Sequence, residues 1–258
     1  MADWLALVIG NSRWHWAWFQ EMNLRWVGHA PHRHQSPATS LNTLLPDHAP
    51  PELHAISSQP LTVWAVSVVP AQRAYLNRPL NVHWIQQLPL KNIYPTMGLD
   101  RRVSLWGAGQ HYSWPVLVID SGTALTFTAG ADASFKGGAI LLGLRSHFRA
   151  LHHYTAALPP IEPPTDLPPP WAMTTPDAIQ SGVLYPLLAG IHHYIQTWQQ
   201  QYPNTNLIFT GGDGEYLHRL YQTYLQQQNQ VLHNRTWFDA NLMFWGIAAY
   251  RNEATREL

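Results

Sequence analysis

The chain of 258 residues contains no cysteine, which excludes disulfides, thiolate nucleophiles and cysteine-based metal sites. Charged residues are scarce, at 12%, and the 15 Lys and Arg balance the 15 Asp and Glu. Because no excess of positive charge is present, we do not expect nucleic acid as a partner. An anionic substrate would have to be held by backbone donors and a few chosen cations.

Long apolar runs are also missing. No segment reaches the roughly 18 residues that a spanning helix needs, and no basic region precedes the first apolar run. We therefore expect a soluble cytoplasmic protein that does not enter a membrane. Hydrophobic residues nevertheless make up 46% of the chain, enough for one large domain or two modest ones.

The stretch from Val116 to Thr128 is typical of a β-turn-β unit. The apolar run Val116 to Ile119 predicts a buried strand that ends on a single carboxylate, Asp120. Ser121-Gly122-Thr123 then predicts a tight turn before a second strand. Backbone N–H groups in such a turn suit a phosphate, and the carboxylate suits an accompanying cation. An ordinary hairpin with a solvated aspartate fits the same pattern.

A similar unit opens the chain. Trp4 to Ile9 predicts a strand, Gly10-Asn11-Ser12-Arg13 a turn, and Trp14 to Phe19 a second strand. Two such units suggest an internal duplication. A third turn, Thr210-Gly211-Gly212, follows the apolar run that begins at Leu207.

The remaining segments are predicted as follows. We expect irregular chain from His29 to Gln35, a helix from about Gly98 to Ala108, and a loop from Ala131 to Lys136. Thr175 is expected to cap a helix running to about Gln200, and a final helix is expected from Phe238 to Asn252. Asp100 falls in the first turn of its helix, where the helix dipole alone would explain an acid.

Phosphoryl transfer requires phosphate-holding turns, a carboxylate for a cation and another carboxylate for the nucleophile. Asp120 and Asp100 are the candidate acids. Neither a P-loop sequence nor the protein-kinase signatures occur. The paired histidines His152-His153 and His192-His193 lack the spacing of a metal site.

The ordered set of motifs resembles type III pantothenate kinase, of the acetate kinase, actin and Hsp70-like superfamily. The motifs that carry the resemblance span nearly the whole chain: Gly10-Asn11-Ser12, Ser67 to Pro70, Tyr94 with Gly98-Leu99-Asp100-Arg101, Asp120 to Ala124, Gly137-Gly138 with Gly143, Leu151 to Pro159, Thr175 with Ala178 to Gly182, and Thr210 to Asp213.

The resemblance implies an α/β fold of two ribonuclease-H-like halves, residues 1–114 and 115–258, with the active site in the cleft. It implies ATP-dependent phosphorylation of pantothenate, the first step of coenzyme A synthesis, with Mg²⁺ and a monovalent cation, K⁺ or NH₄⁺. It also implies a homodimer with composite active sites, in which Thr175 reaches the site of the neighbouring subunit.

The resemblance also assigns roles to individual residues. Asp100 matches the family's catalytic base, and Asp120 matches the cation site. The pantothenate pocket corresponds to Tyr94, Gly98, Leu99, Arg101 and Thr175. The nucleotide-binding turns correspond to Gly10, Asn11, Ser12, Gly122, Thr123, Thr210, Gly211 and Gly212.

One position departs from the family pattern. The family's first motif begins with an aspartate that helps to hold Mg²⁺ through water, and Val8 stands there in this chain. A second hypothesis is therefore a non-catalytic pantothenate- or nucleotide-binding regulator, similar to Bvg accessory factor. A third is a kinase or phosphatase of the same superfamily with another substrate, against which Tyr94 and Arg101 argue.

Overall fold

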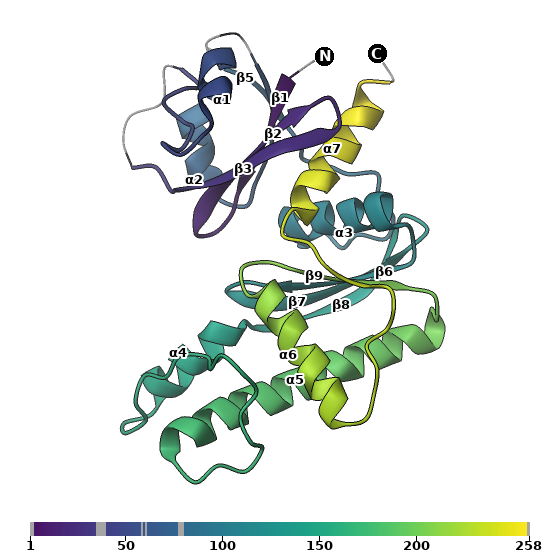
Figure 1. The fold of residues 1–258 in the computed structure, drawn as a ribbon. Coiled ribbons are helices and arrows are strands. Elements are labelled where there is room, and N and C mark those ends of the chain that lie inside the picture. The colour runs from purple at the N-terminus through teal and green to yellow at the C-terminus, as the bar shows by residue number, and fades with distance from the viewer. Residues whose placement is uncertain (1–2, 35–39, 58, 60, 77–79, 257–258) are drawn as a thin grey trace. The chain divides into compact units, whose positions relative to one another are not determined.

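A computed structural model describes residues 3–34, 40–57, 59, 61–76 and 80–256. The chain divides into two compact units. Unit 1 is Met1–Gln110 with Met243–Leu258, and unit 2 is His111–Leu242. Each unit contains one five-stranded sheet (Figure 1).

The sheet of unit 1 contains β1 (Asp3–Ile9), β2 (Arg13–Gln20), β3 (Asn23–Pro31), β4 (Thr62–Ser67) and β5 (Asn81–Trp84) in the order β3-β2-β1-β4-β5. Strands β1 to β3 are antiparallel, whereas β4 and β5 run parallel to β1. Strand β1 lies at the centre and is buried on both faces, which explains its unbroken apolar sequence.

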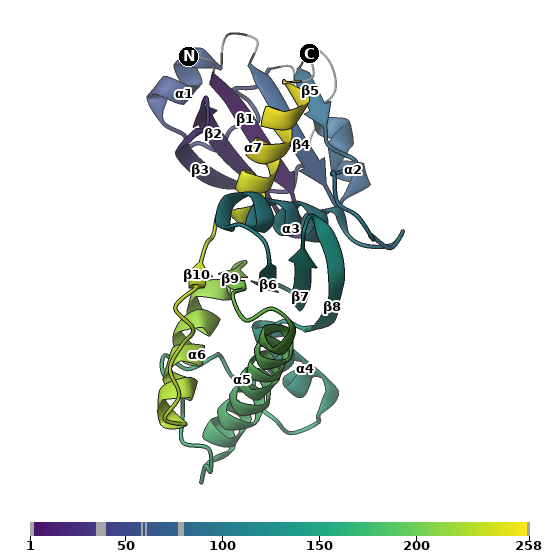
Figure 2. The same ribbon diagram turned by 90° about the vertical axis from the view of Figure 1, so that its right-hand side faces the viewer.

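Helices cover both faces of this sheet. One face carries a core that includes Leu53 of α1 (Pro51–Ile56) and Leu76 of the 3₁₀ helix η1 (Ala74–Leu76), which follows α2 (Pro70–Arg73). On the other face, α3 (Leu99–Tyr112) and α7 (Leu242–Ala254) pack against β1 and β4 (Figure 2). Gly246 permits close packing of these helices, since a side chain there would collide with the Val103 carbonyl.

The sheet of unit 2 contains β6 (Val116–Ser121), β7 (Ala124–Ala131), β8 (Ser134–Leu142), β9 (Asn206–Thr210) and β10 (Thr236–Phe238). Its order, β10-β9-β6-β7-β8, repeats the first sheet: the first strand is central, the next two are antiparallel, and the last two are parallel to it. The helices α4 (Leu144–Tyr154), α5 (Thr175–Gln201) and α6 (Gly214–Gln227) bury a single large core with this sheet. The duplicated α/β fold expected from the sequence is confirmed.

Several local predictions were wrong. The first three residues of the segment expected to be irregular, 29–31, end β3, an edge strand whose weak alternation hides it, while 32–34 are irregular as expected and Gln35 lies outside the described residues. The loop expected at 131–136 is a two-residue hairpin turn, because Asp132 and Ala133 both adopt positive φ. Thr174, rather than Thr175, caps α5, because its hydroxyl accepts the Asp177 N–H at 3.3 Å.

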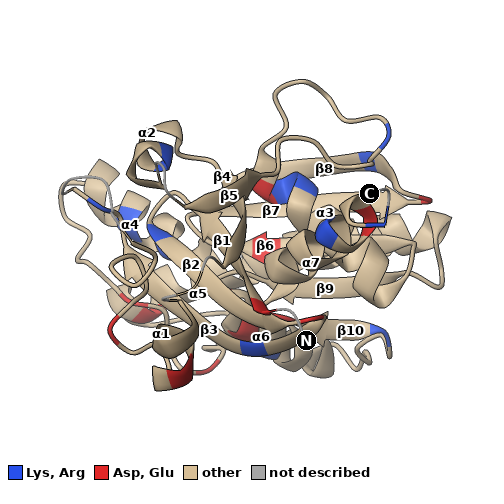
Figure 3. Cartoon of the chain, turned by 90° about the horizontal axis from the view of Figure 1, so that it is seen from above, with Lys and Arg blue, Asp and Glu red and all other residues tan. Residues whose placement is uncertain are grey.

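The final helix begins later than expected, at Leu242, because 236–238 form β10. Among the residues that the structure describes, no helix combines the length and apolarity that a membrane span requires. Charged side chains are few, and both signs occur (Figure 3).

Candidate active site

The first predicted phosphate turn joins β1 to β2 in unit 1. The Gly10 N–H closes the turn on the Arg13 carbonyl at 3.1 Å, and the Gly10 carbonyl accepts a hydrogen bond from His32 Nε2 at 2.8 Å. Asn11 and Ser12 are exposed at its tip. The structure thus places all three predicted residues on one open turn, where amide N–H groups and a hydroxyl can receive an anion.

Val8 is 2% exposed and belongs to the apolar core shared with α3 and α7. Its cross-strand neighbour is His15 of β2. Cross-strand partners project from the same face of a sheet, so an imidazole rather than a carboxylate is the polar group next to this position. His15 was not among the residues predicted from the sequence, because the register that pairs it with Val8 becomes visible only in the sheet.

Four of the predicted substrate residues gather at the beginning of α3. The buried Arg101 donates from Nη1 to the Tyr94 hydroxyl at 2.8 Å. Asp100 lies in the first turn, where its Oδ1 accepts the Arg101 N–H at 2.8 Å. Gly98 leaves space for this carboxylate, which a side chain at that position would meet, and Leu99 packs partly into the core behind it. The beginning of α3 therefore carries a carboxylate and a guanidinium on adjacent residues.

A cavity of about 280 Å³ adjoins this cluster. Its lining comes from the segment before α3 and from α3 itself: Gln87, Leu88, Leu90, Ile93, Tyr94, Pro95 and Arg102. Arg102 is held by a hydrogen bond from Nη2 to the Pro95 carbonyl at 3.2 Å. Apolar side chains and the polar groups of Gln87, Tyr94 and Arg102 share its lining.

The second predicted turn joins β6 to β7 in unit 2. The Gly122 N–H donates to the Ala124 carbonyl at 2.9 Å. The Thr123 carbonyl accepts from the Gly143 N–H at 2.9 Å and from the Ser146 hydroxyl at 2.8 Å. The beginning of α4 therefore fixes this turn, while the Thr123 side chain stays exposed.

The third turn lies beside the second, because β9 is parallel to β6 and Thr210 pairs with Asp120. Gly211 has φ of 87°, and a side chain on it would collide with the Asp120 carboxylate and the Ser121 carbonyl. The Asp213 N–H donates to the same Ser121 carbonyl at 2.9 Å. Six predicted residues of unit 2 thus meet at the carboxyl ends of β6 and β9: Asp120, Gly122, Thr123, Thr210, Gly211 and Gly212.

An ion-pair network borders these turns. Arg145 donates from Nε to the buried Asp213 carboxylate at 3.0 Å and from Nη1 to Glu162 at 2.9 Å. The nearly complete burial of Asp213 gives this pair more weight than an exposed one. Arg145 thereby anchors the loop after β9 to α4.

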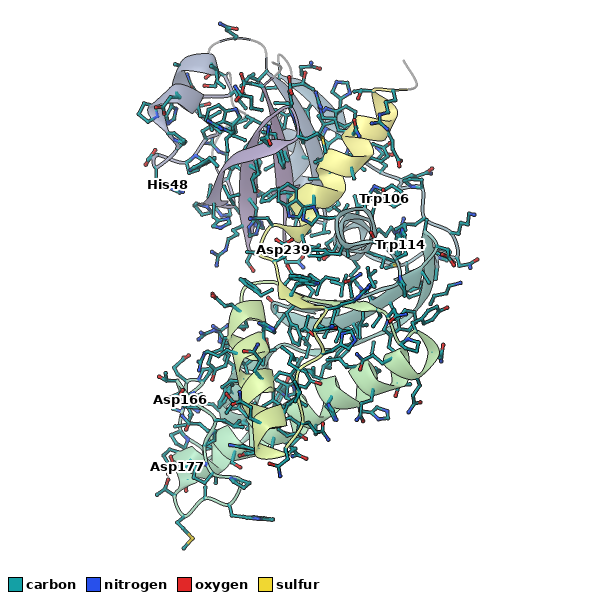
Figure 4. The ribbon with its side chains drawn as sticks, turned by 45° about the vertical axis from the view of Figure 1, so that its right-hand side comes forward. His48, Trp106, Trp114, Asp166, Asp177 and Asp239 are labelled. Carbon is teal, nitrogen blue, oxygen red and sulfur yellow. The ribbon has the colours of Figure 1, made fainter. Side chains whose placement is uncertain are left out.

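Thr175 lies apart from the other predicted residues of unit 2. It is exposed at the N-terminal end of α5, and Figure 4 labels Asp177 in the same turn, away from the sheet. The loop that precedes α5 also carries exposed apolar side chains, including Trp171 and Met173, which are 91% and 99% exposed. The structure therefore does not bring Thr175 to the β6–β9 edge of its own unit.

Comparisons with known proteins identify the family. Residues 4–197 match the model of the type III pantothenate kinase family. The type III pantothenate kinase of Nostoc sp. is 39% identical over 265 residues, covering 95% of this chain and 93% of its own. That of Thermosynechococcus vestitus is also 39% identical, over 98% of this chain and 92% of its own.

Solved structures show the same fold at low identity. A Campylobacter jejuni protein described as a Baf family transcriptional activator matches with a TM-score of 0.61 and 19% identity, over 98% of this chain and 99% of its own. A ROK hexokinase from Thermus thermophilus matches with a TM-score of 0.52 and 10% identity, over 98% and 99%. The family model and the sequence relatives, together with this fold, show that the chain belongs to the type III pantothenate kinase family.

Proposed function

We propose that the protein transfers the γ-phosphoryl group of ATP to the hydroxyl of pantothenate, giving 4'-phosphopantothenate, the first step of coenzyme A synthesis. The observation that carries the proposal is the cluster at the beginning of α3. There the Asp100 carboxylate stands next to an Arg101 guanidinium that the Tyr94 hydroxyl holds in place. The Asp100 carboxylate can receive an alcohol and the Arg101 guanidinium can receive a carboxylate. Pantothenate carries both an alcohol and a carboxylate.

The two groups have separate tasks in this mechanism. Asp100 accepts the proton of the substrate hydroxyl and orients it for in-line attack on the γ-phosphate. Arg101 receives the pantothenate carboxylate, because a guanidinium fork matches that planar anion. Tyr94, Gly98, Leu99 and a partner subunit's Thr175 complete the pocket in this proposal.

ATP is proposed to bind through the glycine turns. The turn at Gly10-Asn11-Ser12 and the turn at Gly122-Thr123 offer donors to phosphate oxygens, and Thr210 to Gly212 serve the adenosine side.

We propose that Mg²⁺ and a monovalent cation bind near Asp120. This carboxylate is half-buried at a strand end, and it fits against Gly211 because that residue has no side chain to collide with it. No cluster of three acidic or histidine side chains occurs among the described residues. A single carboxylate completed by phosphate oxygens and water is a common arrangement for Mg²⁺. When bound, the divalent ion would neutralise charge that develops on the transferred phosphoryl group.

The test is formation of phosphopantothenate by the purified protein with ATP and Mg²⁺, in K⁺ and in Na⁺. We expect product in both salts and faster turnover in K⁺. Binding of pantothenate without product at millimolar ATP would support the regulator hypothesis instead. Val8 motivates that alternative, but the relatives at about 40% identity are named as kinases. An acceptor screen tests the third hypothesis, a different substrate.

We further propose that the enzyme acts in the cytoplasm, where ATP is available, as a homodimer that unit 2 assembles. Strand β8 is an edge strand whose outward side chains Ile140 and Leu142 are 63% and 49% exposed. Exposed apolar groups on an edge strand mark an interface, and a second copy of the chain is the expected occupant. The exposed Thr175 would then be available to a neighbouring site.

Leu142→Asp is expected to convert the dimer to a monomer and to reduce pantothenate phosphorylation strongly, because a carboxylate cannot be buried in an apolar interface. Size-exclusion chromatography with light scattering gives the mass, and the kinase assay gives the activity. Val231→Asp is the matched control, since Val231 is 92% exposed in the segment after α6. A wild-type protein that is monomeric and active would contradict the dimer proposal.

A further inference from the structure

The side chain of His15 reaches the phosphate turn of unit 1 from the second strand of the hairpin. It projects from the same sheet face as Val8, its cross-strand partner. At Gly10, the vacant side-chain position lies 3.5 Å from the Arg13 carbonyl and 3.6 Å from His15 Nε2. The Nε2 edge of the imidazole therefore borders the space that the glycine leaves open beside the turn.

A second histidine fixes the orientation of this ring. His15 Nδ1 lies 3.0 Å from Nδ1 of His29 on β3, and the rings pack edge to face at 4.8 Å between centroids. Because both atoms of this contact are Nδ1, one must donate and the other accept, so the contact holds a single proton. If His29 donates, a neutral His15 carries its own proton on Nε2, the edge that borders the turn.

The charges around the pair favour an anion over a metal cation. Besides burial, the charge of the exposed Arg13 on β2 lowers the pKa of both His15 and His29, and the charge of His48, labelled in Figure 4 on the loop before α1, also lowers the pKa of His29. Burial, followed by the proximity of His29 and Arg13, lowers the pKa of His15 to about 4. His15 is therefore neutral at physiological pH, with one nitrogen that donates and one that accepts. Val8 contributes no carboxylate that could attract a cation to this position.

We propose that His15 contacts the nucleotide directly: its Nε2–H donates a hydrogen bond to a β- or γ-phosphate oxygen of ATP held at the Gly10-Asn11-Ser12 turn. His29 is a positioning residue: it does not touch the nucleotide, and it holds the His15 ring through the contact between the two Nδ1 atoms. The inference deepens the proposed function, because it rests on this turn being a triphosphate site. It gives the turn of unit 1 a side-chain donor next to the position where the family carries an aspartate.

The first test compares nucleotides by calorimetry in the intact protein. His15→Ala is expected to raise the Kd of ATP by about ten- to a hundredfold, the range for one hydrogen bond to a charged acceptor. The Kd of AMP, which lacks the terminal phosphates, and the KM of pantothenate are expected to stay within about twofold. His83→Ala is the matched control, because His83 is an exposed histidine on β5 of the same sheet.

The second test reads the tautomer of His15 by ¹⁵N NMR. In the wild type we expect Nε2 to carry the proton, with the Nε2–H resonance shifting when ATP is added. His29→Ala is expected to leave the fold intact, to mix the two tautomers of His15 and to weaken ATP binding less than His15→Ala does. A purely structural role for His29 would not change the tautomer.

The outcomes separate the two proposals. Equal losses for ATP and AMP in His15→Ala, or no loss for ATP, would overturn the role of His15. Circular dichroism and the pantothenate KM show whether His15→Ala is folded, and His15→Gln provides a second variant that keeps a donor. If His15→Ala weakens ATP binding as expected but the wild type makes no phosphopantothenate, the proposed function fails and the inference about His15 survives. A wild type that does not bind ATP overturns both.

Discussion

Asp100→Asn is expected to lower kcat for pantothenate phosphorylation by about 10²- to 10⁴-fold, the usual contribution of a general base. Asparagine has the same shape and keeps an Oδ1 that can accept the Arg101 N–H, which Asp100 accepts at 2.8 Å. It cannot take up the proton of the substrate hydroxyl. The loss should therefore fall on kcat, while the KM values of ATP and pantothenate change little.

Steady-state kinetics with both substrates varied, together with thermal unfolding, provide the measurement. Glu52→Gln is the matched control, because Glu52 is an exposed acid in the first turn of α1, another helix of unit 1. We expect it to retain wild-type kinetics. If Asp100→Asn kept kcat within a few-fold of the wild type, the carboxylate would have only the capping role that its place in α3 also allows, and another residue would have to serve as the base.

Gly211→Ala is expected to destabilise the protein by about 2–5 kcal/mol and to abolish ATP binding. The backbone at Gly211 has φ of 87°, a region that costs an L-residue roughly 1–2 kcal/mol. Its new methyl group would also collide with the Ser121 carbonyl and the Asp120 carboxylate, which adds overpacking of about 1–3 kcal/mol. Relief of this collision would push β9 away from β6 at the place where Asp120 and the glycine turns meet.

Urea unfolding measures the free-energy change, and calorimetry measures ATP binding. Gly212→Ala serves as the stability control, since Gly212 is exposed, its φ is ordinary and nothing lies within 4 Å of an added methyl group. Its free energy of unfolding is expected to stay within about 0.5 kcal/mol of the wild type. Equal stability of the two variants would contradict this prediction, because it would mean that β9 can move away from β6 at no cost in free energy.

Much of the fold could be predicted because its strongest patterns are local. The apolar runs of β1 and β6 are central strands buried on both faces, and each is followed by a turn sequence rich in glycine and small polar residues. The repetition of this unit indicated the duplication that the strand orders display. Strand β3 was missed because an edge strand with one weakly buried face has no clear alternation.

The local errors have equally physical causes. Asp132 and Ala133 form a tight turn because both have positive φ. Alanine rarely adopts positive φ, so the sequence does not indicate a turn at this position. At the beginning of α5, two adjacent threonines offered two capping positions. The helix uses Thr174, whose hydroxyl reaches the Asp177 N–H.

By itself, the sequence determined which segments are strands at the centre of each sheet, where the glycine turns lie and which acids stand next to them, because chemistry and periodicity along the chain suffice for that. The tertiary structure alone decided which distant groups meet: Asp120 with Gly211, Asp213 with Arg145, and Val8 with His15. Strand register sets these contacts. Register depends on the packing of whole sheets, since a shift of one residue would turn every side chain to the opposite face.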